Sequence, residues 1–346
     1  MQAIVLVGGE GTRLRPLTLT TPKPALPLVD RPFLRFAVDW LARHGASEVV
    51  MACASDAAPL REALSRAQGG PAIRFVEEPE PLGTAGPLRL AADLGILAER
   101  FLAVNGDLLT DLDLSALLRA HAERGAVATI ALHTVADPSP YGLVRCAPDG
   151  AVTAFVEKPE PGAAGPGEVN AGAYVLERAV VELIPSGRPV SIEREVFPRL
   201  AGQGLYGLRL EGYWMDIGTP DRYLQASWDV LEGRVETNVP TDGSGVFVAA
   251  GATVDEGATI GPRAVVGPAC AVAGGAAVSG SVLLSGCFVG PAAEVRDSIV
   301  GRGAEVGPGA RVRGAVIGDG ARLGAGARLE PGARVGPGDE VPGGRG

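Results

Sequence analysis

The chain has 346 residues and a formal net charge of −9. An acidic chain of this length has room for two domains, and its charge excludes a general nucleic-acid binder or a polybasic membrane surface. Its four scattered cysteines show neither the density of a disulfide scaffold nor the spacing of a zinc site.

The first apolar run, at residues 3–7, follows Met1 without a charged leader. It is too short for a signal sequence or a membrane span. We therefore expect a cytoplasmic protein that binds neither membrane nor nucleic acid.

Short apolar runs alternate with helical patterns up to about residue 232, as an α/β fold requires. The pattern predicts strands at 3–7, 48–52, 101–104 and 127–133, and an amphipathic helix at 32–44. Ligands of such sheets gather beyond the carboxyl ends of the strands. The glycine-rich turn at 8–13 and Asp107 should therefore face one crevice.

The glycine-rich turn reads Gly8-Gly9-Glu10-Gly11-Thr12-Arg13. It has neither the dinucleotide-binding spacing nor the Gly-Lys-Ser/Thr end of a P-loop. Its glycines let backbone N–H groups approach an anion, and Arg13 adds a guanidinium. A plain strand-to-loop turn with a solvated arginine is the alternative.

Only two of the 31 basic residues are lysines, Lys23 and Lys158, and each precedes a proline. A chain that otherwise uses arginine keeps lysine where a compact ammonium on a flexible stem is needed. Lys23, ten residues after Arg13, can bring a second cation to the same phosphates. Chance retention of two lysines is the alternative.

From residue 245 the composition changes, and lysine and histidine no longer occur. Aliphatic residues recur every six residues from Val248 to Leu284, and after slips of five the beat continues to Val335. This period is typical of a β-helix, and it resembles the left-handed parallel β-helix of hexapeptide-repeat proteins. Low-complexity sequence is the alternative. We expect an α/β domain over 1–235, a linker over 236–244 and a β-helix over 245–346.

The run from Leu6 through Arg13 to Pro24 resembles the signature of sugar-1-phosphate nucleotidylyltransferases. Further blocks agree in order along the chain: Pro81–Pro87, Asn105–Asp107, Tyr141-Gly142, Phe155–Pro159, Asn170–Gly172, Ser191–Pro198 and Trp214–Pro220. With the β-helix, the similarity covers nearly the whole chain. Within the family, the sequence is most similar to the mannose-1-phosphate guanylyltransferases.

The resemblance implies a Rossmann-like nucleotidyltransferase domain with a mixed, mostly parallel sheet. It also implies the reaction of GTP with mannose 1-phosphate to give GDP-mannose and pyrophosphate, by in-line attack of the sugar phosphate on the α-phosphorus. Because the nucleophile is already an anion, alignment and charge neutralisation can carry this chemistry.

Site residues follow from the same resemblance. The catalytic residues would be Arg13, Lys23, Asp107, Lys158 and Asp216, of which Asp107 and Asp216 would hold Mg²⁺. The nucleotide would be bound by Leu6, Gly8, Gly9, Gly11, Thr12, Arg13, Lys23, Glu78, Gly83, Thr84 and Asp107. The sugar phosphate would be bound by Gly142, Glu157, Lys158 and Asn170. Ordinary capping aspartates and a solvated Glu-Lys pair are the alternatives.

Glu78 matches a position at which thymidylyl and uridylyl relatives carry a base-reading Gln. An ionised carboxylate can accept from both N1–H and N2–H₂ of guanine, whereas a pyrimidine also needs a donor. Guanine is therefore favoured. Glu77 and Glu80 compete for the assignment, and a solvated loop acid is the other interpretation.

Other functions stay open at this point. One is another nucleotide and sugar pair: glucose 1-phosphate with dTTP, UTP or ATP, or heptose 1-phosphate with GTP. Another is a non-catalytic regulatory paralogue. Acyl transfer is disfavoured, because acyltransferases with such a β-helix use a histidine from it and none follows His133. We expect the β-helix to join copies of the chain into a homo-oligomer.

Overall fold

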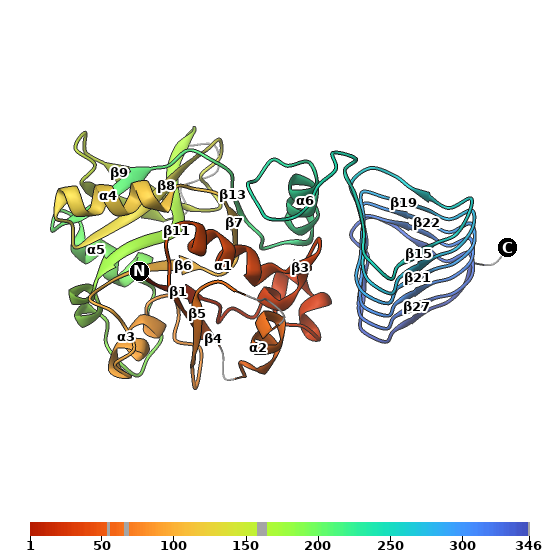
Figure 1. The fold of residues 1–346 in the computed structure, drawn as a ribbon, viewed down its shortest axis with the longest axis horizontal. Helices are drawn as coiled ribbons and strands as arrows, with labels where there is room; N and C mark the ends of the chain where they lie inside the picture. Colours follow the sequence, from red (N-terminus) through yellow and green to blue (C-terminus); the bar gives the residue numbers. More distant parts are fainter. Residues whose placement is uncertain (54–55, 66–68, 158–164, 345–346) are drawn as a thin grey trace. The chain divides into compact units, whose positions relative to one another are not determined.

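The computed structural model describes residues 1–346 apart from 54–55, 66–68, 158–164 and 345–346, and apart from the side chains of 156–157. The chain forms two compact units, coloured by sequence in Figure 1. Unit 1 consists of Met1–Gly9 and Ala37–Trp214, and unit 2 of Glu10–Phe36 and Met215–Gly346.

Unit 1 is built on a mixed sheet that has nine strands among the described residues, with β10-β9-β11-β6-β1-β4-β5 as its main order and β8 and β12 branching from β11. The strands are β1 (Gln2–Leu6), β4 (Glu48–Cys53), β5 (Ala72–Glu77), β6 (Arg100–Asn105), β8 (Ala128–Val135), β9 (Gly142–Cys146), β10 (Val152–Glu157), β11 (Gly167–Glu177) and β12 (Leu205–Arg209). The block β6-β1-β4-β5 is parallel, and β11 is antiparallel to its neighbours. The α/β fold expected from the sequence is confirmed.

Helices α2 (Ala58–Ser65), α3 (Gly86–Asp93), α4 (Leu114–Arg124) and α5 (Phe197–Leu200) belong to unit 1, and α1 (Phe33–Arg43) runs across the boundary between the units. Each strand predicted from alternating apolar runs is present, shifted by at most two residues at either end. The parallel strands read as continuous apolar runs because both faces are buried, as Ile4, Val50 and Phe101 show.

The carboxyl ends of β1 and β6 lie next to each other. Leu6 pairs with Asn105, and the N–H of Gly106 donates to the Leu6 carbonyl at 2.9 Å. A Cβ on Gly106 would lie only 2.3 Å from Val7 Cγ1, so this close approach needs glycine. The glycine-rich turn and Asp107 therefore leave neighbouring strands at the same edge of the sheet.

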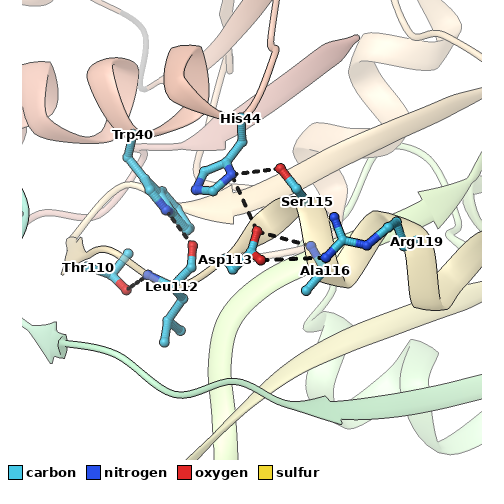
Figure 2. Close-up of polar contacts among 8 residues, drawn as sticks. All are labelled: Trp40, His44, Thr110, Leu112, Asp113, Ser115, Ala116 and Arg119. Carbon is cyan, nitrogen blue, oxygen red and sulfur yellow. Dashed lines mark hydrogen bonds and ion pairs between the residues drawn. The ribbon is translucent and has the colours of Figure 1, made fainter.

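The chain beyond Asp107 is fixed by a polar network (Figure 2). Trp40 of α1 donates its indole N–H to the Leu112 carbonyl at 2.9 Å. The Asp113 carboxylate caps α4 by accepting from the N–H of Ala116, and His44 Nδ1 lies 3.0 Å from Ser115 Oγ. This network anchors α1 to the start of α4.

Unit 2 contains residues 10–36, helix α6 (Pro220–Leu231) and the β-helix. The segment 10–36 includes short helical turns at Thr12–Leu14, Leu17–Leu19 and Lys23–Ala25 and the pair β2 (Pro27–Leu28) and β3 (Arg31–Pro32). No helix in the described ranges has the length and apolarity needed to cross a membrane.

The strands of the β-helix are parallel and, among the described residues, form three sheets, whose stacked coils are visible in Figure 1. The first sheet has β14 (Val246–Val248), β17 (Ala264–Val266), β20 (Val282–Leu283), β23 (Ile299–Val300), β26 (Val316–Ile317) and β29 (Arg334–Val335). The second has β15 (Thr253–Val254), β18 (Ala271–Val272), β21 (Phe288–Val289), β24 (Glu305–Val306), β27 (Arg322–Leu323) and β30 (Glu340–Val341). The third has β16 (Thr259–Ile260), β19 (Ala277–Ser279), β22 (Glu294–Arg296), β25 (Arg311–Arg313) and β28 (Arg328–Leu329). This is the left-handed parallel β-helix expected from the six-residue period.

One step of the predicted interior column is wrong by a residue. Leu283, not Leu284, pairs with Val266 and Val300 and packs in the interior. The five-residue slip therefore falls between Val278 and Leu283. The six-residue beat alone favoured Leu284, because both leucines are apolar and adjacent.

Candidate active site

Glu78 lies against the start of the glycine-rich turn. A Cβ on Gly8 would sit 2.8 Å from Glu78 Oε1, so only a glycine lets the carboxyl come this close to the backbone. Glu78 Oε2 accepts the N–H of Leu82 at 2.9 Å. The structure thus brings Gly8 and Glu78 together.

The Glu78 side chain is not a solvated loop acid, because only 3% of the residue is exposed. Burial raises the pKa of its carboxyl, and the hydrogen bond from the Leu82 N–H partly opposes that rise. The competing residue Glu77 forms an exposed ion pair with Arg61 at 3.2 Å. Glu78 is therefore the buried acceptor of this acidic run.

The other residues of the turn differ in exposure. Leu6 and Gly8 are half-buried, whereas Gly9 and Thr12 are exposed. Gly11 adopts a left-handed conformation with φ of 61° and begins the helical turn Thr12–Leu14. The turn therefore presents glycine backbone to solvent, which suits approach by an anion.

Asp107 is half-buried just beyond β6, in a group of residues centred on the Tyr174 hydroxyl. Asn170 donates its amide N–H to that hydroxyl at 2.9 Å and accepts the N–H of Gly172. Burial raises the pKa of Tyr174 well above its usual range, and the nearby charges of Glu193 and Asp107 add to the rise. Asp107 and Asn170 therefore lie around one buried phenol.

A bulge in β11 produces this arrangement. The register of β11 against β8 shifts between Asn170 and Tyr174, and Gly172 in between has φ of 73°. A Cβ there would lie 2.7 Å from the Asn105 side-chain nitrogen. The bulge thus brings β11 close to the end of β6.

The expected sugar-phosphate positions also converge along strand backbones. Gly142 of β9 pairs with Glu157 of β10, and the next residue of β9, Leu143, pairs with Val169, which precedes Asn170. The side chain of Glu157 and all of Lys158 lie outside the described residues, so their assigned roles stay predictions.

Three aromatic rings near these strands were not assigned a role from the sequence. Trp214 packs edge-on against Tyr141 with ring centroids 5.2 Å apart, and its ring is 5.5 Å from that of His133. The Trp214 indole donates to the Ala171 carbonyl at 2.9 Å, within the β11 bulge. Trp214 and Tyr141 both lie in sequence blocks that resemble the nucleotidylyltransferase family. Their membership of these blocks is the sequence feature that could have pointed to them.

Thr84 and Gly83 serve a structural purpose in the described part of the chain. The Thr84 hydroxyl donates to Glu193 at 2.8 Å and accepts the N–H of Ile192. Gly83 has φ of 75° and stands where a Cβ would meet the Val190 carbonyl at 2.6 Å. These contacts hold the 81–87 loop beside the 191–198 run, and Glu193 had no assigned role in the sequence analysis.

In unit 2, the fold of the loop backbone places Lys23 next to the glycine-rich turn. Lys23 is buried at 9% exposure, and a Cβ on Gly11 would lie 3.1 Å from the Lys23 Cβ. Thr18 donates its hydroxyl to the Gly11 carbonyl at 2.9 Å. The loop thus folds back so that Lys23 returns to the glycine-rich turn.

Arg13 and Asp216 flank Gly218. A Cβ on Gly218 would lie 2.5 Å from Arg13 Nη2 and 3.3 Å from Asp216 Oδ1. Asp216 also pairs with Arg222 of α6, with Nη1 and Oδ2 3.2 Å apart, while 22% of the Asp216 side chain remains exposed. Arg222 was missed, although an arginine just inside a helix that begins at Thr219-Pro220 is a detectable signal.

Asp107 of unit 1 and Asp216 of unit 2 are each only partly buried as residues. Carboxylate and phosphate oxygens are the ligands that hard divalent cations such as Mg²⁺ prefer. Within the described ranges, no three His, Cys, Asp or Glu side chains gather closely enough to form a metal cage.

Family comparisons match the two parts of the chain separately. Residues 2–233 match the Nucleotidyl transferase family, and residues 243–341 match the GMPPB C-terminal domain.

Similar proteins include a mannose-1-phosphate guanylyltransferase of Mycobacterium tuberculosis, 39% identical over 67% of this chain and 65% of the relative. A mannose-1-phosphate guanyltransferase of Yarrowia lipolytica is 40% identical over 70% of this chain and 68% of the relative. The match to the Mycobacterium protein thus spans slightly less than two thirds of that relative's length.

Among solved structures, HddC from Yersinia pseudotuberculosis superposes with a TM-score of 0.57 at 27% identity, over 65% of this chain and 97% of HddC. HddC was also solved complexed with GMP-PN. The match of residues 2–233, with the glycine-rich turn and the strand-end residues in place, shows that the chain belongs to the nucleotidyl transferase family.

Proposed function

We propose that the protein joins GTP to mannose 1-phosphate, giving GDP-mannose and pyrophosphate. The observation that carries the choice of nucleotide is the buried Glu78 carboxyl against the Gly8 backbone. The choice of sugar is supported by the names of the relatives, which are mannose-1-phosphate guanylyltransferases about 40% identical to the chain.

In the proposed reaction an oxygen of the sugar phosphate forms a bond to the α-phosphorus. The bond from that phosphorus to the bridging oxygen breaks, and pyrophosphate leaves with the electron pair. Arg13 and Lys23 neutralise the charge that gathers on the leaving pyrophosphate. Gly142, Glu157, Lys158 and Asn170 hold the sugar phosphate in line.

Nucleotidyl transferases generally use a divalent metal ion. We infer that the ion here is Mg²⁺ and that Asp107 and Asp216 would hold it, because both residues carry a carboxylate and are only partly buried. When bound, Mg²⁺ supplies Lewis-acid polarisation of phosphoryl oxygens. Arg222 keeps Asp216 oriented, since the two form an ion pair.

The proposal is tested by measuring pyrophosphate release from ATP, GTP, UTP and dTTP, each with the 1-phosphates of mannose, glucose, galactose, N-acetylglucosamine and a heptose. We expect the highest kcat/KM for GTP with mannose 1-phosphate. A higher value for any other pair would replace the proposed substrates. Binding of nucleotides without turnover of any pair would identify a regulatory paralogue instead.

Self-association through the β-helix also remains a proposal. The interior column is open at the first coil, where Val248 and Val254 are 44% and 39% exposed. Light scattering of the full chain, compared with a Val248→Asp, Val254→Asp variant, tests it. An unchanged mass for the variant would remove this end from the interface.

The cytoplasmic location and the domain boundaries 1–235, 236–244 and 245–346 likewise stay predictions.

A further inference from the structure

One sheet of the β-helix is apolar on both faces. In the strand pairs of this sheet, Val266, Leu283, Val300, Ile317 and Val335 form the inner column. The adjacent outward residues Val265, Val282, Ile299 and Val316 form a second column, and they are only 0–6% exposed. We call these four residues the outer column.

The other two sheets are different. Their outward residues include Phe288, which is 41% exposed, and the exposed charged residues Glu305, Arg311, Arg322 and Arg328. An outward apolar side chain becomes buried only where other chain covers it. The outer column is therefore a packing face of the β-helix.

Polar contacts within unit 2 tie another segment of the chain to the β-helix. Arg302 donates to the Thr21 hydroxyl at 2.9 Å, and Thr20 donates to Asp319 Oδ2 at 2.8 Å. Asp319 Oδ1 accepts the backbone N–H of Arg302 at 2.8 Å, so the two residues that contact 20–21 are also hydrogen-bonded to each other across successive coils. Residues 20–21, just before Lys23, are thus tied to the β-helix.

A third contact reaches the glycine-rich turn itself. Arg334, which follows the outer column in β29, donates from Nη1 to the Arg13 carbonyl at 3.0 Å and also to the Arg15 carbonyl. The Arg13 side chain meanwhile lies at Gly218. The β-helix therefore holds the backbone that carries Arg13, while the Arg13 guanidinium lies beside Gly218.

We propose that the β-helix positions the nucleotide-binding segment 10–24, with Arg302, Asp319 and Arg334 as the positioning residues. We assign these side chains no contact with substrate. They fix the backbone between Arg13 and Lys23, so the two cations meet the triphosphate without first being ordered. The role goes beyond oligomerisation, and its kinetic consequence rests on the proposed function.

The test uses the full chain with Arg334→Ala, Arg334→Lys and the control Arg328→Ala. Arg328 is an exposed arginine six residues earlier, on a different sheet. Hydrogen–deuterium exchange of residues 10–24 is measured without ligand, and KM is measured for GTP and for mannose 1-phosphate. Exchange does not depend on turnover, so it judges the positioning role even if the wild type prefers other substrates.

We expect Arg334→Ala to speed exchange in 10–24 and to raise the KM for GTP about tenfold, since losing charge-assisted hydrogen bonds has consequences of this order. The KM for mannose 1-phosphate should stay within about twofold. Arg334→Lys should recover part of both effects, because an ammonium still donates to carbonyls. Arg328→Ala should match the wild type.

A second pair of variants guards against misfolding of Arg334→Ala. Thr21→Val removes the hydroxyl that accepts from Arg302 while keeping the volume, and Thr259→Val, on the first coil, is its control. Faster exchange in 10–24 for Thr21→Val alone supports the proposal. Unchanged exchange in both Arg334→Ala and Thr21→Val overturns it, as does an equal rise of both KM values.

Discussion

Glu78 is a buried carboxyl against the backbone of the glycine-rich turn, where we propose that a triphosphate binds. Its raised pKa means that it gains a proton at a higher pH than an ordinary glutamate, whose pKa is 4.5. Only the ionised form can accept from both donors of guanine. Binding of GTP should therefore depend on pH through this one residue.

We predict that the KM for GTP rises as the pH falls through the raised pKa of Glu78, because protonation removes an acceptor and adds a donor. Glu78→Gln should abolish this dependence and weaken the preference for GTP over UTP by about tenfold, the usual effect of one mispaired hydrogen bond. Steady-state kinetics from pH 5 to 8 measure both. An unaltered nucleotide ranking in Glu78→Gln would end the base-reading role.

Substitution of Asp107 tests the proposed metal site at the scale of a single residue. Asp107→Asn should lower kcat by about a hundredfold or more, because metal polarisation of phosphate contributes several kcal/mol. The melting temperature should barely change, since Asp107 is half-buried and keeps its shape as Asn. The control Asp113→Asn keeps a helix cap and should retain wild-type kcat. A near-normal rate of Asp107→Asn in Mg²⁺ would exclude the metal role.

Single residues with unusual chemistry were the easiest to predict from the sequence. Gly8 and Glu78 do come together, although nothing in the sequence shows that Glu78 is buried while Glu77 is exposed. The partners of the histidines were not foreseen: His44 lies beside Ser115, and His121 contacts Thr129 and Glu177. The contacts with Ser115 and Glu177 join residues 71 and 56 positions apart, so they depend on tertiary packing.

At the scale of elements, β11 does more than fill the sheet. Its bulge between Asn170 and Tyr174 brings Gly172 to the end of β6 and places the Tyr174 hydroxyl among Asn170 and the charges of Glu193 and Asp107. A bulge can aim side chains at a site in this way. The strand was not among those predicted, because its apolar run is interrupted by Asn170 and Gly172.

Tyr174→Phe tests the bulge. Losing the hydroxyl deprives the Asn170 amide of its acceptor, so we expect a several-fold higher KM for mannose 1-phosphate and about 1 kcal/mol lower stability. The KM for GTP should change little. Urea denaturation and steady-state kinetics measure these effects. An unchanged sugar-phosphate KM would show that Asn170 keeps its place without Tyr174.

At the scale of the molecule, the β-helix combines a regular interior with one apolar outer face. Sequence periodicity predicts the interior, since each coil repeats the same inward residue. It does not predict the outer column, because Val265 or Ile299 beside an inward aliphatic residue looks like a longer apolar run. Nor does it predict which chain segment covers that column.

The outer column predicts an asymmetry in stability. Ile299→Ala should cost about 2–4 kcal/mol because it empties a fully buried site, although Ile299 points away from the interior. Phe288→Ala, also outward but 41% exposed, should cost less than about 0.5 kcal/mol. Chemical denaturation followed by circular dichroism compares them. Equal costs would mean that nothing packs on the outer column.

The number of coils also sets how far along the β-helix each side chain that contacts the loop lies. Val265, Val282, Ile299 and Val316 recur at 17-residue intervals, and each added coil advances the strands by about 4.8 Å. Deleting one coil between Val282 and Ile299 would keep every aliphatic residue in register, yet it would draw Arg302, Asp319 and Arg334 one step away from Thr20, Thr21 and Arg13. During evolution such a protein can therefore lengthen its β-helix freely only beyond Arg334, whereas the number of coils before it is fixed by the loop they hold.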